Sequence, residues 1–212
     1  MKRRHIPFAL SLPMVLGSGL TWAQQAFRAG KDYQTLERPV PTDVGPGKVE
    51  LIEFFWYSCP HCNNFEPTFV QWIRNAPRDV VVRRVPVAFR DDFAPQQRLY
   101  YTLEAMGLLE TVHHKVFHAV HVERLPLNTD ALIQSWVEKQ GVDGKKFAET
   151  YKSFGVAGKV RRAVQLQNEF RVEGVPSLGI AGRYYTDGSM AGNMERALKV
   201  AEFLIAQTQQ GR

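Results

Sequence analysis

The chain has 212 residues, of which 44% are hydrophobic and 23% are charged, proportions typical of an ordinary globular protein. Its formal net charge of +6 falls to +3 if the three basic residues at positions 2–4 are removed with an N-terminal signal. A charge this small does not indicate nucleic-acid binding. Cys59 and Cys62 are the only cysteines, so the fold cannot depend on a framework of disulfides.

Residues 1–23 are typical of a cleavable secretory signal. Three basic residues precede an apolar run over residues 6–20, and Thr21 and Ala23 stand where a signal peptidase reads small side chains. Prolines and glycines interrupt the run, which is shorter than the roughly 20 apolar residues that a membrane-spanning helix needs. A retained membrane anchor is the alternative, and Arg3-Arg4 is compatible with twin-arginine export. We expect the mature protein to be soluble and exported.

The spacing of the two cysteines indicates reactivity rather than a structural bridge. A disulfide between Cys59 and Cys62 would enclose only two residues, so it would stabilise the fold little. A mature chain of this length buries enough apolar surface to fold without one. The motif also follows an apolar run at residues 49–57, and a Cys-x-x-Cys pair at the end of a buried strand is typical of a thiol–disulfide redox site.

In the first half of the chain, residues 24–36 form a polar lead-in that can add a short strand, and residues 39–48 are a turn-rich connection. Residues 49–57 are continuously apolar, which predicts a central strand covered on both faces. A helix is predicted from Pro60 to Ala76-Pro77, because apolar residues recur at helical spacing between them. Residues 79–89 then supply a second strand rich in β-branched residues.

The second half of the chain is mainly helical before strands return. Residues 95–121, 130–140 and 144–170 are helix-like, with breaks expected at Leu125-Pro126, Gly141, Gly155 and Gly158. Strands are predicted at residues 175–180 and 183–186 around a turn at Ala181-Gly182, and Asn193 can cap a final helix over residues 194–206. The order predicts one α/β domain, residues 24–90 and 166–212, interrupted by an all-helical domain, residues 91–165.

Several motifs in this order carry a family resemblance. Glu53-Phe54-Phe55 precedes Cys59-Pro60-His61-Cys62, and Gly174-Val175-Pro176 follows the helical insertion and leads into a hairpin and a helix. The chain therefore resembles the DsbA family of periplasmic thiol:disulfide oxidoreductases over nearly its whole mature length. The resemblance implies a thioredoxin-like fold with an inserted helical domain.

The helix start predicts different roles for the two cysteines. Cys59 would lie at the helix N-terminus, where free N–H groups and the helix dipole favour a thiolate, so we expect it to be the nucleophile. Cys62, one turn further along, would be the more buried resolving thiol. His61 can direct its imidazole towards the Cys59 sulfur, and Pro60-His61 favours a thiolate more than an apolar or glycine-containing pair would. The resemblance implies that the disulfide is strongly oxidising.

Three further residues enter the predicted site through the resemblance. It implies that Pro176 is a cis proline facing the cysteines, although sequence alone favours trans, and that Val175 offers its main chain to an extended substrate. Glu53 stands on the apolar strand, where burying a carboxylate costs free energy unless it has a partner or a purpose. The resemblance implies a proton relay to the buried cysteine, whereas a strand-end residue paired to a lysine or arginine is the plainer interpretation.

The resulting hypothesis is a monomeric periplasmic oxidase that donates the Cys59–Cys62 disulfide to newly exported proteins with free thiols. It needs no bound cofactor, no metal and no nucleic acid, and the resemblance implies reoxidation by a DsbB-like quinone-linked membrane protein. A disulfide isomerase or reductase is an alternative, although residues 24–48 leave no room for a dimerisation domain. A glutathione-dependent isomerase and a metal-delivery module that uses the two cysteines are the others.

Three groups of residues are not explained by redox chemistry. His113, His114, His118 and His121 lie close together, and the last three share a helical face that could bind zinc or copper, although outward-facing histidines are commoner. Trp56, Tyr57 and Phe89 could line an apolar groove or pack in the core. Arg83-Arg84 and Arg161-Arg162 are most simply solvated surface.

Overall fold

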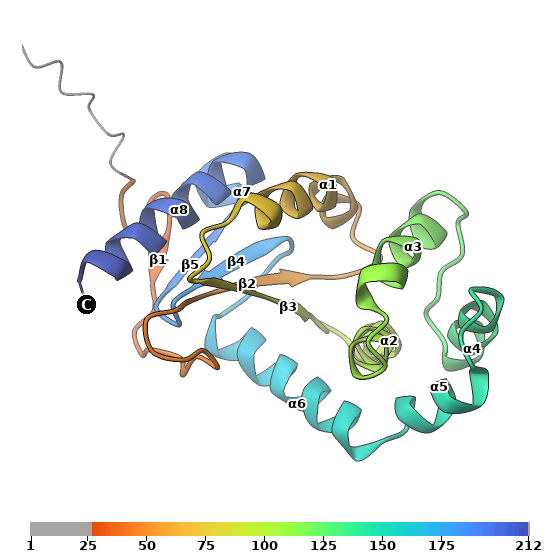
Figure 1. The fold of residues 1–212 in the computed structure, drawn as a ribbon. Helices are drawn as coiled ribbons and strands as arrows, with labels where there is room; N and C mark the ends of the chain where they lie inside the picture. Colours follow the sequence, from red (N-terminus) through yellow and green to blue (C-terminus); the bar gives the residue numbers. More distant parts are fainter. Residues whose placement is uncertain (1–26, 212) are drawn as a thin grey trace, which may run out of the picture.

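The computed structural model describes residues 27–211, and the predicted signal at residues 1–23 lies outside this range. A mixed sheet in the order β1-β5-β4-β2-β3 forms the centre of the fold (Figure 1). The strands are β1 (Gln34–Thr35), β2 (Val49–Phe55), β3 (Val80–Pro86), β4 (Ser177–Ile180) and β5 (Tyr184–Asp187). β2 and β3 are parallel, and the other pairs are antiparallel.

Strand β2 is buried along its whole length, because helices cover both faces of the sheet. α1 (Pro60–Asn75) and α8 (Met194–Gln210) lie on one face, and α6 (Phe154–Glu169) lies on the other (Figure 1). Leu51 packs in the cluster that contains Phe69 of α1, whereas the Phe54 ring lies 5.3 Å from Phe170 at the end of α6. Side chains alternate between the faces of a strand, so the continuous apolar run is what a doubly covered strand requires.

Tight turns and caps fix the C-terminal part of the sheet. Three residues join β4 and β5, and the N–H of Arg183 closes a tight turn on the carbonyl of Ile180 at 2.9 Å. Ala181 and Gly182, at the centre of this turn, have φ +53° and +64°, the left-handed conformation of a type I′ turn. A Cβ at position 182 would lie 2.0 Å from the carbonyl oxygen of Val40, so only glycine fits there. Asn193 caps α8 by accepting a hydrogen bond from the N–H of Arg196 at 2.7 Å.

The segment between β3 and β4 is helical. It comprises the short 3₁₀ helix η1 (Asp91–Phe93) and the helices α2 (Ala94–Ala105), α3 (Leu109–His121), α4 (Asp130–Lys139), α5 (Gly144–Tyr151) and α6; a short helix α7 (Gly188–Ala191) precedes α8. α2 lies at the centre of this segment, and its Leu99 and Leu103 are fully buried. Thr129, Asp143 and Ser153 cap the helices that follow them.

The predicted α/β fold with a helical insertion is confirmed, but two helix breaks differ. The segment predicted as helix-like over residues 95–121 is divided at residues 106–108, where Gly107 has φ +70°. Gly155 and Gly158 lie inside α6, and the break falls at Lys152 and Ser153 instead, because the Ser153 side chain caps α6. A glycine within a helix costs only about 1 kcal/mol, so a good cap outweighs it. α6 also runs unbroken past residues 165 and 166, where a domain boundary is predicted, and the division into domains stays a prediction.

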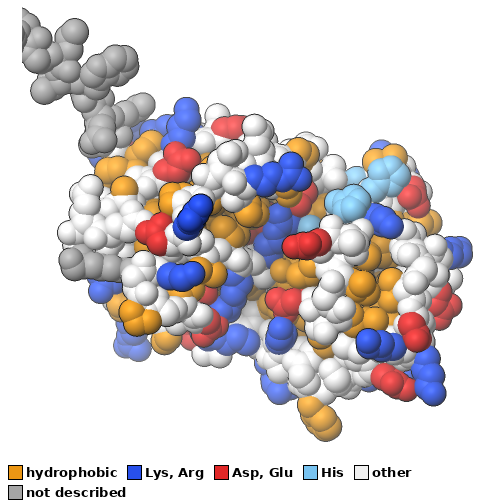
Figure 2. Space-filling model, in the orientation of Figure 1, with side chains coloured by type: hydrophobic (Ala, Val, Ile, Leu, Met, Phe, Trp, Pro, Cys, Tyr) orange, Lys and Arg blue, Asp and Glu red, His pale blue; other side chains and the backbone are white. Residues whose placement is uncertain are grey.

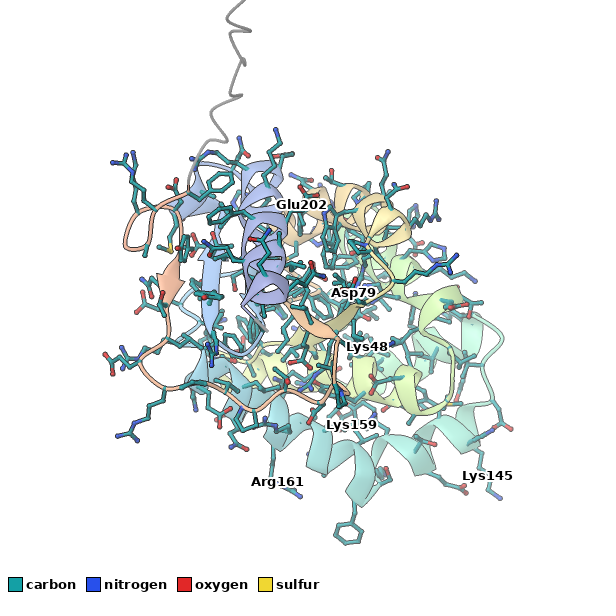
Figure 3. All side chains as sticks on the ribbon, turned by 60° about the vertical axis from the view of Figure 1, so that its left-hand side comes forward. Lys48, Asp79, Lys145, Lys159, Arg161 and Glu202 are labelled. Atoms are coloured by element: carbon teal, nitrogen blue, oxygen red, sulfur yellow. The ribbon has the colours of Figure 1, made fainter. Side chains whose placement is uncertain are left out.

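Charged side chains of both signs are interspersed over the face of the molecule shown in Figure 2. Lys145, Lys159 and Arg161 project from α5 and α6 and are exposed (Figure 3), so the predicted solvated character of Arg161 is confirmed. Mixed charge of this kind agrees with the modest net charge of the chain. Within residues 27–211, no helix is both long enough and apolar enough to cross a membrane.

Candidate active site

The two cysteines lie where β2 passes into α1. A turn closed by a hydrogen bond from the N–H of Cys59 to the carbonyl of Trp56 (3.0 Å) places Cys59 at the N-cap of α1. Pro60 occupies the first helical turn, where the missing N–H costs nothing. The N–H of Cys62 points at the Cys59 sulfur at 3.4 Å. Both cysteines are free thiols; Cys59 is 7% exposed and Cys62 is 0% exposed.

The environments of the two thiols push their pKa values in opposite directions. The pKa of Cys59 is lowered to about 6, mainly by hydrogen bonding from the Cys62 side chain, with further help from the N–H groups of Cys62 and His61 and from the charge of His61. Burial raises the pKa of Cys62 far above its usual range, and the hydrogen bond to Cys59 raises it further. Cys59 is therefore a stable thiolate at neutral pH, whereas Cys62 holds its proton.

The loop before β4 completes the surroundings of Cys59. The Val175-Pro176 peptide bond is cis, and the carbonyl oxygen of Val175 lies 3.4 Å from the Cys59 sulfur, which can donate to it when the thiol is protonated. These residues are 116 positions apart in the chain, so the sheet brings them together. His61 is exposed beside Cys59 and acts on it through its backbone N–H and its charge. All the predicted thiol-contacting residues thus gather at one end of β2.

Glu53 is fully buried on β2 and is paired with Arg84 at the facing position of β3. Its Oε2 lies 3.4 Å from Nε of Arg84 but accepts no hydrogen bond. Burial is the main reason that the pKa of Glu53 rises to about 8, and the charge of Arg84 limits the rise. The arginine partner of the plainer interpretation is therefore present, whereas the proton relay stays a prediction.

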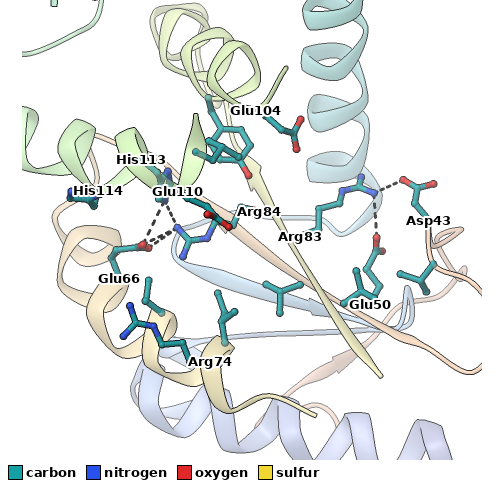
Figure 4. Close-up of a pocket in the computed structure, with 17 residues that line it drawn as sticks. Asp43, Glu50, Glu66, Arg74, Arg83, Arg84, Glu104, Glu110, His113 and His114 are labelled. Carbon is teal, nitrogen blue, oxygen red and sulfur yellow. Dashed lines mark hydrogen bonds and ion pairs between the residues drawn. The ribbon is translucent and has the colours of Figure 1, made fainter. Parts of the chain in front are cut away.

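Arg84 makes its strong contacts elsewhere. Its Nη1 donates to both carboxylate oxygens of Glu66 on α1 at 2.9 Å and contacts Nε2 of His113 on α3 (Figure 4). Burial opposes ionisation of Glu66, but His113 and Arg84 together lower its pKa. The prediction that Arg83-Arg84 is solvated surface is wrong for Arg84, because three buried polar groups hold its guanidinium inside. Glu66 balances the charge of Arg84, which leaves Glu53 free to be neutral.

These residues border a groove of about 940 Å³ between α1, α3 and the open edge of β3 (Figure 4). Glu66, Arg84 and His113 line one part of it, and Arg83 lines the other, where it is paired with Asp43 and Glu50. The groove brings solvent close to the ion network formed by Glu66, Arg84 and His113.

The helical insertion also holds the turn that carries Cys59. Nε2 of Gln96 on α2 donates to the Ser58 hydroxyl at 2.7 Å and to the carbonyl of Pro126 at 3.0 Å. The Trp56 ring stacks on Phe93 with centroids 3.7 Å apart. The turn is thus attached to residues far away in the sequence, which a rigid redox site requires.

Four residues around the site were not predicted as part of it: Glu66, Arg84, His113 and Gln96. Arg84 was expected on the solvated surface, and His113 was named only in the histidine cluster. Glu66 could have been found from the helical period, because it lies four residues after Cys62 and shares its face of α1. His113 stands beside Val112 and Val116 on the buried side of α3, so the same period indicated burial. Arg84 and Gln96 carried no such signal, because their partners come from distant elements.

The histidine cluster divides into buried and exposed members. His113 is buried, whereas His118 is exposed and contacts Glu123 at 2.9 Å. His121 is hydrogen-bonded to the main-chain carbonyl of Tyr57. Among residues 27–211, no three histidine, cysteine or acidic side chains are placed to hold a metal ion.

The predicted aromatic groove is also divided. Tyr57 is fully buried in the core, so it cannot line a surface. Trp56 is partly buried against Phe93, and Phe89 is 39% exposed beside the same ring. Core packing is therefore the right interpretation for Tyr57.

Comparisons with known proteins agree with this geometry. Residues 84–199 match the model of the DSBA-like thioredoxin domain family. The chain is 39% identical over 201 residues to a thiol:disulfide interchange protein DsbA of Burkholderia cepacia, a match that covers 94% of this chain and 95% of the relative. It is 42% identical over 182 residues to the DsbA of Bordetella parapertussis, covering 85% and 86% of the two chains.

Solved structures give the same result. The crystal structure of Pseudomonas aeruginosa DsbA has a TM-score of 0.83 and 39% sequence identity to this chain, and the match covers 87% of this chain and 96% of that one. The DsbA of Xylella fastidiosa has a TM-score of 0.80 at 25% identity, covering 86% and 98%. With the two thiols at the start of α1 and relatives matched over nearly their whole length, the chain belongs to the DsbA family of thiol:disulfide oxidoreductases.

Proposed function

We propose that the protein is a dithiol oxidase that passes a Cys59–Cys62 disulfide to pairs of thiols in newly exported proteins. The observation that carries this proposal is the contrast between the two thiols, one a partly accessible thiolate and the other a fully buried thiol. An enzyme that stabilises its reduced form in this way gains free energy by giving its disulfide away. A reductase needs the opposite: its disulfide form must be the more stable one, so that it readily gives up electrons.

The transfer proceeds in two exchange steps. A substrate thiolate attacks the Cys59 sulfur of the oxidised enzyme, the S–S bond breaks, and Cys62 leaves with the electron pair and takes up a proton. A second substrate thiolate then attacks the substrate sulfur of the mixed disulfide and releases Cys59 as a thiolate. The substrate loses two electrons and the enzyme gains them. Because Cys59 has a low pKa, it is a better leaving group than the substrate sulfur of the mixed disulfide. The second step therefore runs towards the oxidised substrate.

Glu53 supplies the proton that the first step requires. Cys62 has a high pKa and is a poor leaving group unless it is protonated as the bond breaks. Glu53 acts electrostatically on Cys62, and with a pKa of about 8 its carboxyl is mostly protonated at neutral pH. It can therefore donate to Cys62 and recover its proton afterwards.

Val175 and Pro176 form the substrate-binding part of this proposal. The Val175 carbonyl oxygen lies 3.4 Å from the Cys59 sulfur, so it faces the reacting atom. An extended substrate can pair its main chain with Val175 and bring its own cysteine to Cys59. Pro60 and His61 complete the site, Pro60 at the helix start and His61 as an exposed charge beside the thiolate.

The reduced enzyme must lose two electrons before another cycle. We place the protein in the periplasm as a monomer and assign its reoxidation to a DsbB-like, quinone-linked membrane protein. The relatives named thiol:disulfide interchange protein DsbA and the signal-like residues 1–23 support this assignment. The two cysteines carry the electrons themselves, so the cycle includes no bound cofactor.

Titration of the mature protein against glutathione redox buffers, with acid quenching of the thiols, tests the direction of transfer. A potential well above that of glutathione is expected; a strongly reducing value would contradict the oxidase role. Cys59→Ser should abolish transfer, whereas Cys62→Ser, mixed with a substrate protein that carries a disulfide, should accumulate a mixed disulfide at Cys59, because no Cys62 thiol remains to resolve it. If Cys59→Ser trapped substrates and Cys62→Ser did not, the assigned roles would be reversed.

A further inference from the structure

Tyr57, two residues before Cys59, is held at both ends by histidines of α3. Its hydroxyl lies 2.7 Å from Nδ1 of His113, and its carbonyl oxygen lies 2.8 Å from Nε2 of His121. The tyrosine itself is fully buried. Figure 1 shows the reason: β2 ends against α3 before the chain turns back into α1. Two of the four clustered histidines therefore contact the turn that carries the reactive thiol.

The chemistry of its partner fixes the direction of the His121 hydrogen bond. The Tyr57 carbonyl can only accept, so Nε2 of His121 must carry a hydrogen and donate it. Nε2 of His113 lies between the Arg84 guanidinium and the Glu66 carboxylate, and its Nδ1 is hydrogen-bonded to the Tyr57 hydroxyl, which can donate or accept.

The carbonyl that His121 holds belongs to the turn that sets the position of the Cys59 sulfur. The N–H of Cys59 closes this turn on the Trp56 carbonyl at 3.0 Å, and the Cys59 sulfur then receives the N–H of Cys62 at 3.4 Å. Hydrogen bonds weaken steeply with misalignment, so a small rotation of the Tyr57 peptide moves the sulfur away from the N–H groups at the helix start.

We propose that His121 is a positioning residue for Cys59: by donating to the Tyr57 carbonyl, it holds the sulfur in line with the free N–H groups of α1. His113 supports it by fixing the other end of Tyr57. The proposal rests on the assigned role of Cys59 as the nucleophile, and it gives the helical insertion a direct effect on the redox chemistry of the thioredoxin-like part.

A matched pair of variants separates hydrogen bonding from packing. Glutamine and methionine have unbranched side chains of similar length, but only glutamine can donate to the Tyr57 carbonyl. His121→Gln should therefore keep the position of the sulfur, and His121→Met should lose it. His118→Met serves as the control on the same helix, because His118 is exposed and contacts Glu123 only. His121→Asn, whose shorter amide falls short of the carbonyl, replaces the methionine variant if that variant does not fold.

The readout is the pH titration of thiolate absorbance at 240 nm in the reduced proteins. The pKa of Cys62 is raised far out of range, so the low-pH transition reports Cys59 alone. His121→Met should move this transition upward by about one pH unit. The equilibrium constant for reduction of the Cys59–Cys62 disulfide by glutathione should then fall by about tenfold, because the reduced form loses thiolate stabilisation. His121→Gln and His118→Met should titrate within about 0.3 units of the wild type.

Thermal unfolding of each variant distinguishes positioning from simple structural support. If His121→Met or its replacement melts earlier but titrates like the wild type, His121 only stabilises the fold and the proposal is wrong. Equal shifts for the methionine and glutamine variants also overturn it. The wild-type titration is separate evidence: a Cys59 transition near that of an ordinary thiol would instead contradict the proposed function.

Discussion

Glu53 and Arg84 occupy facing positions on the parallel strands β2 and β3, yet Arg84 gives its hydrogen bonds to Glu66. The nearest approach of Glu53 is 3.4 Å, to Nε, and its Oε2 accepts no hydrogen bond. One arginine therefore lies between two carboxyl groups but neutralises only one of them. Burial raises the pKa of Glu53 to about 8, because the charge of Arg84 offsets it only in part and the charge of Glu66 adds to it.

Replacing Arg84, which lies between Glu53 and Glu66, should destabilise the protein in a pH-dependent way. Arg84→Leu leaves Glu66 as a buried charge without a strong partner, and it raises the pKa of Glu53 further, so that Glu53 has to stay protonated above pH 8. We expect a loss of about 3–5 kcal/mol at pH 8.5 and a smaller loss at pH 5. Arg171→Leu is the control, since its exposed pair with Glu37 should contribute at most about 1 kcal/mol. Urea denaturation of the oxidised proteins at both pH values measures the difference, and equal losses for the two variants would contradict the network.

Removing the ionisable group of Glu53 should change the first exchange step. In the wild type, the rate of mixed-disulfide formation per substrate thiolate should fall as the pH rises through about 8, because only protonated Glu53 can donate to Cys62. Glu53→Gln should be slower by about 100-fold at neutral pH and should lose this transition. Stopped-flow mixing of the oxidised enzyme with a cysteine peptide over pH 6–10 gives the profile. A transition that persists in Glu53→Gln must come from another group.

Sequence periodicity was sufficient for the parts of the fold that depend on local order. The continuous apolar run over residues 49–57 identified the central strand, and Cys59 before Pro60 identified a helix start. Asn193 was found as a cap because capping is decided within three residues. The break between α5 and α6 was misplaced because Ser153, a weaker signal than two glycines, decides it.

The part of the site that depends on tertiary packing could not be predicted in this way. Arg84 looks like half of a surface basic pair until α1 and α3 are placed against β3. Gln96 carries no sequence signal, because its partner Ser58 is 38 residues away. The histidine cluster indicated a possible metal site, whereas only the fold shows that His113 and His121 turn towards Tyr57.

A single added methyl group should test how closely the sheet packs behind the site. A Cβ at Gly179 of β4 would lie 2.5 Å from the ring of Phe170, which itself packs on Phe54. Gly179→Ala should therefore destabilise the protein by about 1–3 kcal/mol. Gly45→Ala is the control, because nothing lies within 4 Å of its Cβ and its φ is not positive; it should change stability by less than about 1 kcal/mol. Chemical denaturation measures both, and a neutral Gly179→Ala would mean that Phe170 can move aside.

The two thiols should give the reduced protein a stability maximum in pH. Cys59 has a folded pKa of about 6, below the roughly 8.5 of an unfolded thiol, so its contribution is fully present above pH 8.5 and is lost as the pH falls towards 6. Cys62 has a raised pKa, so its contribution is present below about pH 8.5 and is lost as the pH rises beyond it. The unfolding free energy should rise between about pH 6 and 8.5 by at most about 1.4 kcal/mol per unit, and then fall.

The double variant Cys59→Ser/Cys62→Ser is the reference, because it keeps Glu53 and every other titrating group while it removes both thiols. Subtracting its pH profile, measured by urea denaturation under reducing conditions, isolates the thiol contribution. Cys59→Ser alone should lose the rise below pH 8.5 and keep the fall above it, since only Cys62 remains. A Cys59→Ser profile that still rises from pH 6 would show that another group, and not the Cys59 thiolate, stabilises the reduced protein. The maximum in unfolding free energy requires both thiols, because their pKa values are shifted in opposite directions. Cys62→Ser, which keeps only Cys59, should therefore show the rise between about pH 6 and 8.5 without the fall above it.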